Sequence, residues 1–401
     1  MSSTSAPIRK WTGAAILTYG FRPFFLGAAL WAVLAMLLWM PMISGLITLP
    51  TAFDAVSWHA HEFLFGYLAA VVAGFLLTAV PNWTGRLPIV GWPLGMLVIL
   101  WVLGRVAVAF SAALSPLVVA LLDLSMPIAL AGVITREIVA GKTWRNLLVL
   151  GMLVILTLGS AVFHWEAAKG AYAAQGYGMR IGLGAGIMMI AVIGGRIVPS
   201  FTRNWLVKNT SEILPTPPMQ TFDKIALLSL LAALIAWVFL PSSGIAAVLL
   251  AVAGVLHLVR LTRWAGIHTR GEPLVAILHV AYLLVPLGAI ALVGEIVLPG
   301  LAGLGAVQHI WMSGAVGLMS LAVMTRATLG HSGQSLKAGA GTVMIYIGIL
   351  TATILRVIAG LWPLYASVLY GVAGLIWIMS FAGFAALFGP LLWRAAPAKA
   401  I

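Results

Sequence analysis

Histidines are the residues of this sequence whose type and spacing could do chemistry, because the chain around them is almost entirely apolar. Of its 401 residues, 62% are hydrophobic, 8% are charged and eight are histidine. A histidine inside lipid is costly unless a partner satisfies it, so an intramembrane histidine marks a functional site by default. Histidines from different helices at equal depth are what a haem iron or a copper ion requires.

One group of histidines falls near one end of the predicted helices. His59 and His61 lie about 2–5 Å below the start of the apolar run 58–80, and His309 lies about 6 Å into the run after Gly305. One histidine from each run could ligate a haem iron from opposite sides. His59 and His61 point about 200° apart on a regular helix. One is therefore predicted to hold the haem, and the other to serve a second metal or to pack elsewhere.

Three further residues accompany this group. Glu62 could orient a ligand histidine through a hydrogen bond. Met312 lies three residues beyond His309, on the same helix face, where its sulfur could reach a copper ion. His164 ends another apolar run and is either a metal ligand or an interfacial histidine.

Three arginines near the same end of the helices are candidate partners for haem propionates, and the alternative is ordinary interfacial arginine. They are Arg105, Arg180 and Arg356. Asp123 lies at a depth similar to that of Arg105, which predicts a structural ion pair between the two.

A second group of histidines lies near the opposite face. His257 and His279 are about 8 and 9 Å from that face on neighbouring antiparallel helices, which makes them a candidate haem-binding pair. The alternative is a hydrogen bond that holds the helix hairpin together. His331 follows a later helix on a glycine-flanked turn and could reach the same site as a metal ligand, whereas His268 is expected in solvent.

Apolar runs long enough to cross a hydrocarbon layer about 30 Å thick recur along the whole chain. They predict an all-α, polytopic membrane protein with a bundle of twelve transmembrane helices. The runs are 23–43, 58–80, 92–110, 117–134, 146–165, 177–198, 223–240, 244–262, 273–294, 305–325, 340–360 and 363–387. We expect one transmembrane domain over 23–387, between tails of residues 1–22 and 388–401, with the longest non-helical stretch at 199–222.

The distribution of basic residues predicts the orientation. If both tails are cytoplasmic, including Arg9, Lys10 and Lys399, all but four of the 22 Lys and Arg residues lie on the cytoplasmic side. The four exceptions are Arg105, Lys169, Arg180 and Arg356. The positive-inside rule predicts this pattern for an even number of helices. The net charge of +13 therefore indicates topology and a lipid surrounding, not a nucleic-acid partner.

The absence of cysteine removes several chemistries. It excludes disulfides, iron–sulfur clusters, thiolate nucleophiles and covalent attachment of haem. Any haem must be a b-type haem held non-covalently, and any copper must be held by histidine, methionine, carboxylate or water.

Several long motifs, found in order along nearly the whole chain, resemble the NnrS family of bacterial membrane proteins. They are Arg22-Pro23-Phe24-Phe25, the runs Trp58–Tyr67 and Gly74–Arg86, Phe201-Thr202-Arg203-Asn204, Ile277–Tyr282 and Met324–His331. The resemblance implies a twelve-helix protein of the bacterial inner (cytoplasmic) membrane that contains haem and copper. It also implies an association with denitrification and with resistance to nitric oxide. The motif histidines are His59, His61, His279 and His331, with a looser match at His257 and His309.

The resemblance predicts a protein that binds or detoxifies nitric oxide, with a quinol or a cytochrome as candidate electron donor. If it is an enzyme, it is an oxidoreductase acting on nitric oxide. The alternatives are a membrane electron-transfer or sensor subunit with two bis-histidine haems, and a transporter of copper or haem. A haem–copper centre of the respiratory kind is disfavoured, because residues 177–240 contain no histidine. The sequence leaves open the number of haems, the division of histidines between haem and copper, and the oligomeric state.

Overall fold

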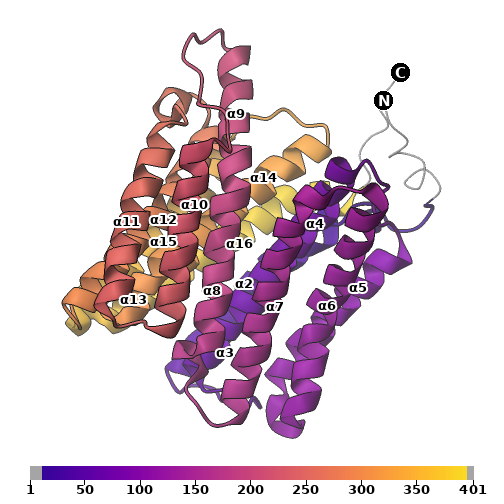
Figure 1. The fold of residues 1–401 in the computed structure, drawn as a ribbon. Coiled ribbons are helices and arrows are strands. Elements are labelled where there is room, and N and C mark those ends of the chain that lie inside the picture. The colour runs from indigo at the N-terminus through magenta and orange to yellow at the C-terminus, as the bar shows by residue number, and fades with distance from the viewer. Residues whose placement is uncertain (1–10, 395–401) are drawn as a thin grey trace. The chain divides into compact units, whose positions relative to one another are not determined.

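The computed structural model describes residues 11–394, and within this range the chain is helical and has no β-strand. Twelve helical stretches are long and apolar enough to cross a membrane, which confirms the predicted fold class (Figure 1). They are Phe21–Ile43 (α2), Ala55–Thr84 (α3, η3 and α4), Trp92–Ala109 (α5), Pro116–Gly141 (α6), Trp144–Ala168 (η5 and α7), Tyr177–Lys208 (α8, η7 and α9), Thr221–Phe239 (α10), Gly244–Thr262 (α11), Pro273–Val297 (α12), Leu304–His331 (α13, η9 and α14), Ala340–Leu361 (α15) and Pro363–Trp393 (η10 and α16). The side on which each helix end lies stays a prediction, and Arg9, Lys10 and Lys399 lie outside the described residues.

The chain forms two compact units. The first unit comprises residues up to Gly182, Ala327–Ser335 and the stretch from Phe381 onwards. The second unit comprises Leu183–Arg326 and Leu336–Ser380. The single transmembrane domain expected from the sequence stays a prediction.

Helices of the first unit begin where the sequence supplies a cap for their unpaired amides. Asp54 precedes α3, and its Oδ1 accepts hydrogen bonds from the amides of Val56 and Ser57 at 3.0 and 2.9 Å. Ser115 precedes α6 in the same way, and Pro116 occupies the first helical position, where no amide donor is needed. These caps fix where α3 and α6 start, and therefore the depth of the polar side chains that they carry.

The motif Arg22-Pro23-Phe24-Phe25 has a structural explanation in the first unit. Arg22 is buried, and its Nη1 donates to the carbonyl oxygens of Leu392 and Arg394 at 3.4 and 2.6 Å. A guanidinium at the end of α16 satisfies carbonyls that the helix leaves unpaired and interacts favourably with its dipole. Arg22 therefore ties the start of α2 to the end of the last helix.

The second unit is built around the α11–α12 hairpin and the helices that pack on it. Trp311, fully buried, donates its indole N–H to the carbonyl oxygen of Val285 at 2.8 Å. Arg260, also fully buried, pairs through Nε with Asp223 Oδ1 at 2.7 Å. Polar side chains in the core of this unit thus have defined partners, as buried polar groups require.

The sequence prediction was wrong for the stretch 199–222. The helix continues through Pro199 as α9 (Gly195–Lys208), and the non-helical part begins only at Asn209. Along α9 the buried residues recur at helical spacing, so packing of this face compensates for the one hydrogen bond that a proline removes. The buried residues are Gly195, Val198, Pro199, Thr202 and Leu206.

Three of the membrane-length helices contain a π-helical segment. The segments are Glu62–Tyr67 (η3), Ile190–Gly194 (η7) and Ile310–Leu318 (η9). A π-helical turn frees a backbone carbonyl from the ordinary helical pattern and is frequent at functional sites. The first segment starts directly after His61, and the third directly after His309.

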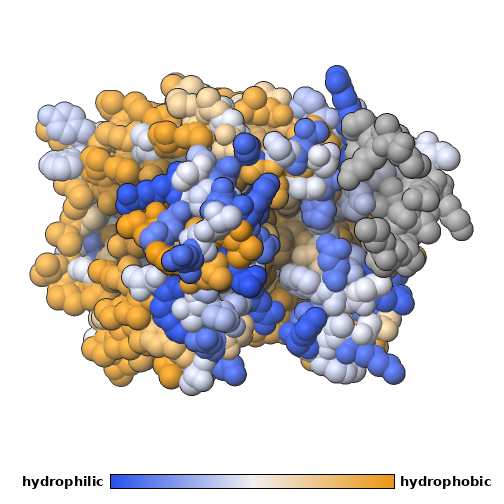
Figure 2. Space-filling view, turned by 90° about the horizontal axis from the view of Figure 1, so that it is seen from above, coloured by the Kyte–Doolittle hydropathy of each residue, from blue (hydrophilic) through white to orange (hydrophobic). Residues whose placement is uncertain are grey.

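Large apolar side chains are exposed along the helix flanks. On α2, for example, Leu30, Leu34 and Leu37 are exposed and recur three to four residues apart. Figure 2 looks onto the helix ends and shows hydrophilic residues gathered there, with hydrophobic residues at the flank on its left side. This pattern is expected when lipid is the solvent for the helix flanks.

Candidate metal centre

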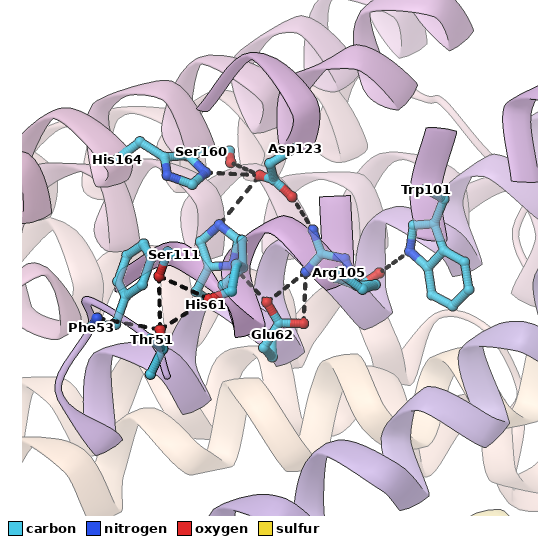
Figure 3. A network of polar contacts seen from close by, with 12 residues as sticks. Thr51, Phe53, His61, Glu62, Trp101, Arg105, Ser111, Asp123, Ser160 and His164 are labelled. Carbon is cyan, nitrogen blue, oxygen red and sulfur yellow. Dashed lines mark hydrogen bonds and ion pairs between the residues drawn. The ribbon is translucent and has the colours of Figure 1, made fainter. Parts of the chain in front are cut away.

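Three side chains of the first unit form a group that could hold a metal ion. Nitrogen atoms of His61 and His164 and a carboxylate oxygen of Asp123 all lie within 4.8 Å of one another. The three residues come from α3, α7 and α6, and all of them are buried. His61 is fully inaccessible. Figure 3 shows the two imidazole rings pointing toward the carboxylate from different helices.

The order and direction of the helices explain how residues so far apart in sequence meet. His61 follows the start of its helix by six residues, and Asp123 follows the start of α6 by seven. His164 precedes the end of α7 by four residues, and Arg105 precedes the end of α5 by four. Because successive helices run in opposite directions, these positions fall at the same end of the bundle. The similar depth of Arg105 and Asp123, as read from the sequence, agrees with this arrangement, and His61 and His164 lie at the same end.

Three polar side chains lie close to one oxygen of Asp123, Oδ2. The hydroxyl of Ser160 donates to Oδ2 at 3.0 Å, and Nε2 of His164 lies 3.0 Å from the same oxygen. Nε2 of His61 lies 3.3 Å from it, within ion-pair range, yet forms no hydrogen bond with it. The other oxygen, Oδ1, accepts a hydrogen bond from Nη2 of Arg105. The predicted ion pair between Arg105 and Asp123 is thus confirmed, and Asp123 has a further role that the sequence did not suggest.

Glu62 fixes the orientation of His61. Its Oε1 lies 3.1 Å from Nδ1 of His61, and both of its oxygens accept from Nη1 of Arg105 at 2.7 Å. An ionised carboxylate can only accept, so Nδ1 of His61 carries a proton. In a neutral ring Nε2 is then a lone pair, and it faces Oδ2 of Asp123. Two acceptors facing each other inside a protein leave a place for a cation.

The charges of the group also favour a cation. Arg105 contributes one positive charge, and Glu62 and Asp123 contribute two negative charges, so neutral histidines leave a net charge of −1. Burial of an uncompensated charge is strongly unfavourable. A metal ion bound between His61, Asp123 and His164 would compensate it.

The donor set fits the copper that the sequence resemblance implies. Two imidazole nitrogens and one carboxylate oxygen suit copper(II), zinc and iron(II), and cysteine is absent from the chain. A ligand histidine of such sites usually donates from its second nitrogen to a carboxylate, and Nδ1 of His61 donates to Glu62 in this way.

His59 and His61 point to different neighbours, as their spacing predicted. The His59 ring stacks on Trp39, with centroids 4.1 Å apart, and lies 4.7 Å from Phe63. His61 alone of the two reaches the metal-binding group. His309 and Met312 belong to the second unit, so the pairing of His309 with His59 or His61 around a haem stays a prediction.

The hydrogen bond of His309 is informative in itself. Its Nδ1 lies 2.5 Å from the carbonyl oxygen of Gly305, one helical turn earlier. A carbonyl only accepts, so Nδ1 carries the proton. A backbone carbonyl on Nδ1 is a common arrangement of metal-ligating histidines.

The candidate haem pair of the second unit has other partners. Nε2 of His257 donates to the carbonyl oxygen of Ala226 at 2.9 Å, and Nδ1 lies 2.7 Å from the hydroxyl of Tyr282. Both nitrogens of His257 are therefore engaged. Nε2 of His279 lies 2.8 Å from the hydroxyl of Thr202, which itself donates to a backbone carbonyl. His279 thus has its proton on Nε2, and Nδ1 has no hydrogen-bond partner.

The remaining predicted residues have other neighbours. His331 ends α14, is exposed, and has its ring 5.3 Å from that of Phe21. Arg180 lies over the ring of Tyr177 at 4.9 Å, and Arg356 lies over the ring of Tyr370 at 4.0 Å. A role of these two arginines toward haem propionates stays a prediction.

The comparisons with known proteins agree with the motifs. A family model described as NnrS protein matches residues 15–395, nearly the whole chain. A search of curated proteins found no match. The match covers every helix that carries the metal-binding group, and on its extent the chain belongs to the NnrS family.

Proposed function

We propose that this NnrS-family protein is a haem- and copper-containing protein of the bacterial inner membrane that binds nitric oxide or removes it. The observation that carries the proposal is the buried group of His61, Asp123 and His164, which combines metal-ligating atoms with a carboxylate that shares one guanidinium with Glu62. Family membership supports the link with nitric oxide.

Copper is the metal that we assign to this group. His61 and His164 would contribute Nε2, and Asp123 would contribute Oδ2; the metal would take the place of the proton that Nε2 of His164 donates to Oδ2. Glu62 would hold the proton on Nδ1 of His61, and Arg105 would hold both carboxylates in place. Three protein ligands leave an open position on a four-coordinate ion, as in catalytic metal sites.

For the haem we assign His309. Its Nδ1 donates to the Gly305 carbonyl, a contact that often orients a ligand histidine. Both nitrogens of His257 have other partners, so His257 is not part of the proposal. A bound haem or copper ion would supply a coordination position for nitric oxide and one-electron redox chemistry, and the chain would supply orientation and a dry surrounding.

The surroundings suit nitric oxide. Phe53, Phe65 and Phe163 contact the His61 ring, with centroid distances of 5.4 to 5.6 Å. A small uncharged molecule that partitions into lipid can approach such a site without the large desolvation free energy that a charged substrate would require. The electron donor, if the protein turns nitric oxide over, is proposed to be a quinol or a cytochrome.

The test is metal and haem analysis of the purified protein together with electron paramagnetic resonance (EPR) spectra before and after addition of nitric oxide. Replacement of His61 or His164 by Ala should remove the copper and its EPR signal. His268→Ala is the matched control, because His268 is exposed and lies in the second unit. His309→Ala should lower the haem content and leave the copper in place.

Two results would contradict the proposal. Wild-type protein that takes up neither copper nor haem, in a host that supplies both, would remove its basis. Haem and copper spectra that do not change on addition of nitric oxide would favour an electron-transfer subunit instead.

A further inference from the structure

Phe53 occupies an unusual position beside the metal-binding group. It lies in the strap of residues 50–54, between α2 and α3, and is 8% exposed although its neighbours Ala52 and Asp54 are exposed. Its ring centroid lies 5.6 Å from that of His61 and 5.8 Å from that of His164. One aromatic side chain of a loop therefore contacts both imidazoles that would hold the metal (Figure 3).

The strap is fixed at both ends by hydrogen bonds. The Ala52 amide donates to Oγ of Ser111 at 2.8 Å, and the hydroxyl oxygens of Thr51 and Ser111 lie 3.0 Å apart. The Thr51 hydroxyl also donates to the carbonyl oxygen of Val108 at 3.0 Å. At the other end Asp54 caps α3. Ser111 lies two residues beyond the end of α5, so the strap is attached near the end of the helix that carries Arg105.

Three phenylalanine rings contact His61, and they differ in how they are held. Phe65 lies in η3 and Phe163 in α7, so both are fixed by a helix. Phe53 is attached to a loop whose position depends on the few hydrogen bonds to Ser111 and Val108. Of the three rings, that of Phe53 is the one that can move without displacing a helix.

We propose that Phe53 determines which external ligands reach the metal held by His61, Asp123 and His164. Under this proposal the Phe53 ring, which lies against both imidazoles, admits a narrow ligand such as nitric oxide and excludes wider donors. This inference rests on the metal site proposed above and adds a specificity-determining residue to it. Size discrimination of this kind typically changes affinity by about 10–200-fold per group added or removed.

The experiment uses the full-length, copper-loaded protein and two probe ligands, read by EPR of Cu²⁺. Azide is a rod one atom wide, and imidazole, labelled with nitrogen-15, is a flat ring. In wild-type protein azide should change the copper spectrum and imidazole should not. In Phe53→Ala imidazole should bind. Its affinity should be at least about tenfold higher than the upper limit that the wild-type measurement sets.

Two further variants separate the role of the ring from its contribution to folding. Phe63→Ala is the matched control, because Phe63 packs on His59 and lies on the same helix as His61. It should leave imidazole excluded. Ser111→Ala keeps the Phe53 ring but removes the hydroxyl that holds the strap, and should admit imidazole more weakly than Phe53→Ala.

The outcomes distinguish this inference from the proposed function. If copper is bound but imidazole is excluded equally in wild type, Phe53→Ala and Ser111→Ala, the role of Phe53 is overturned. The proposed metal site is then unaffected. Imidazole that binds wild-type protein as strongly as Phe53→Ala overturns it as well. If the protein binds no copper, or binds copper equally well without His61 and His164, both proposals are overturned.

Discussion

A Cβ atom on Gly66 would lie 2.5 Å from Nη1 of Arg105, so the guanidinium occupies the space that any other residue would fill. Gly66 lies in η3, and its carbonyl oxygen accepts a hydrogen bond from the indole N–H of Trp101 at 3.0 Å. The π-helical segment thus provides both the room for Arg105 and an acceptor for a neighbouring helix. Arg105 in turn joins Glu62 to Asp123. The shape of η3 therefore determines how the carboxylates of the candidate metal centre are held.

Gly66→Ala should disturb this centre without changing any charged group. The methyl group must displace Nη1 of Arg105, which weakens its contact with Glu62. We expect copper affinity to fall by about 10–100-fold, the range found when outer contacts of metal sites are removed. Gly132→Ala, in α6, is the control because a Cβ there meets no atom within 4 Å. Equal copper affinity in both variants, measured by competition with a chelator, would contradict the role of Gly66.

Glu62→Gln tests whether Glu62 orients His61 or merely fills space. The amide oxygen can still accept a hydrogen bond from Nδ1 of His61, but it carries no charge. The imidazole therefore becomes a weaker ligand of the metal. We expect copper affinity to fall by about 10–100-fold and the copper EPR parameters to shift. Glu62→Asp, which keeps the charge, should recover part of the affinity. An unchanged spectrum in Glu62→Gln would show that Glu62 has no influence on the metal.

Much of this architecture could be predicted from the sequence. The length of the apolar runs identified all twelve helices, because only helices of this length satisfy their backbone inside lipid. The different directions of His59 and His61 followed from helical geometry, and so did the pairing of Arg105 with Asp123. These features depend on local periodicity and on depth, which a sequence contains.

Other features depend on packing between helices, which a single sequence does not contain. Asp123 was expected to form an ion pair only, since nothing in the sequence shows that α6 lies between the helices of His61 and His164. Nothing in the sequence distinguishes Phe53, because a phenylalanine in a loop near a membrane surface is ordinary. The helical continuation through Pro199 was missed, because the packing of α9 compensates for its proline. The equal depth of Asp123 and the histidines was the one signal that could have completed the metal-binding group.

The second unit offers a test of specificity, because it contains a buried polar network with a different balance of charge. Arg260 and Asp223 form one ion pair, and Arg260 also donates to the hydroxyl of Tyr282 at 2.8 Å. With His257 neutral, this network has no net charge and no place for a cation. His257→Gln should therefore leave copper and haem content unchanged and lower the thermal stability through loss of its contact with Tyr282. A loss of haem in this variant, measured by absorption spectroscopy, would instead assign a ligand role to His257.

Arg105→Gln should destabilise the first unit and make its stability depend on copper. Removal of one partner from a buried ion pair typically costs about 3–5 kcal/mol, and here it leaves Glu62 and Asp123 uncompensated. The net charge of the group then becomes −2, which a Cu²⁺ ion cancels. A ligand that binds only the folded state stabilises it in proportion to the logarithm of its concentration over its dissociation constant. Copper should therefore raise the unfolding temperature of Arg105→Gln more than that of wild-type protein.

The matched comparison for this prediction is Mg²⁺ at the same concentration. Magnesium carries the same charge but prefers an octahedral shell of oxygen ligands, which His61 and His164 do not provide. It should raise the unfolding temperature of Arg105→Gln much less than copper does. Equal effects of the two ions would mean that charge alone is compensated and that the imidazoles do not bind the metal. Copper should raise the unfolding temperature of Arg105→Gln more than magnesium does. If this difference disappears in the double variant Arg105→Gln/His164→Ala, the stabilisation is assigned to the group of His61, Asp123 and His164.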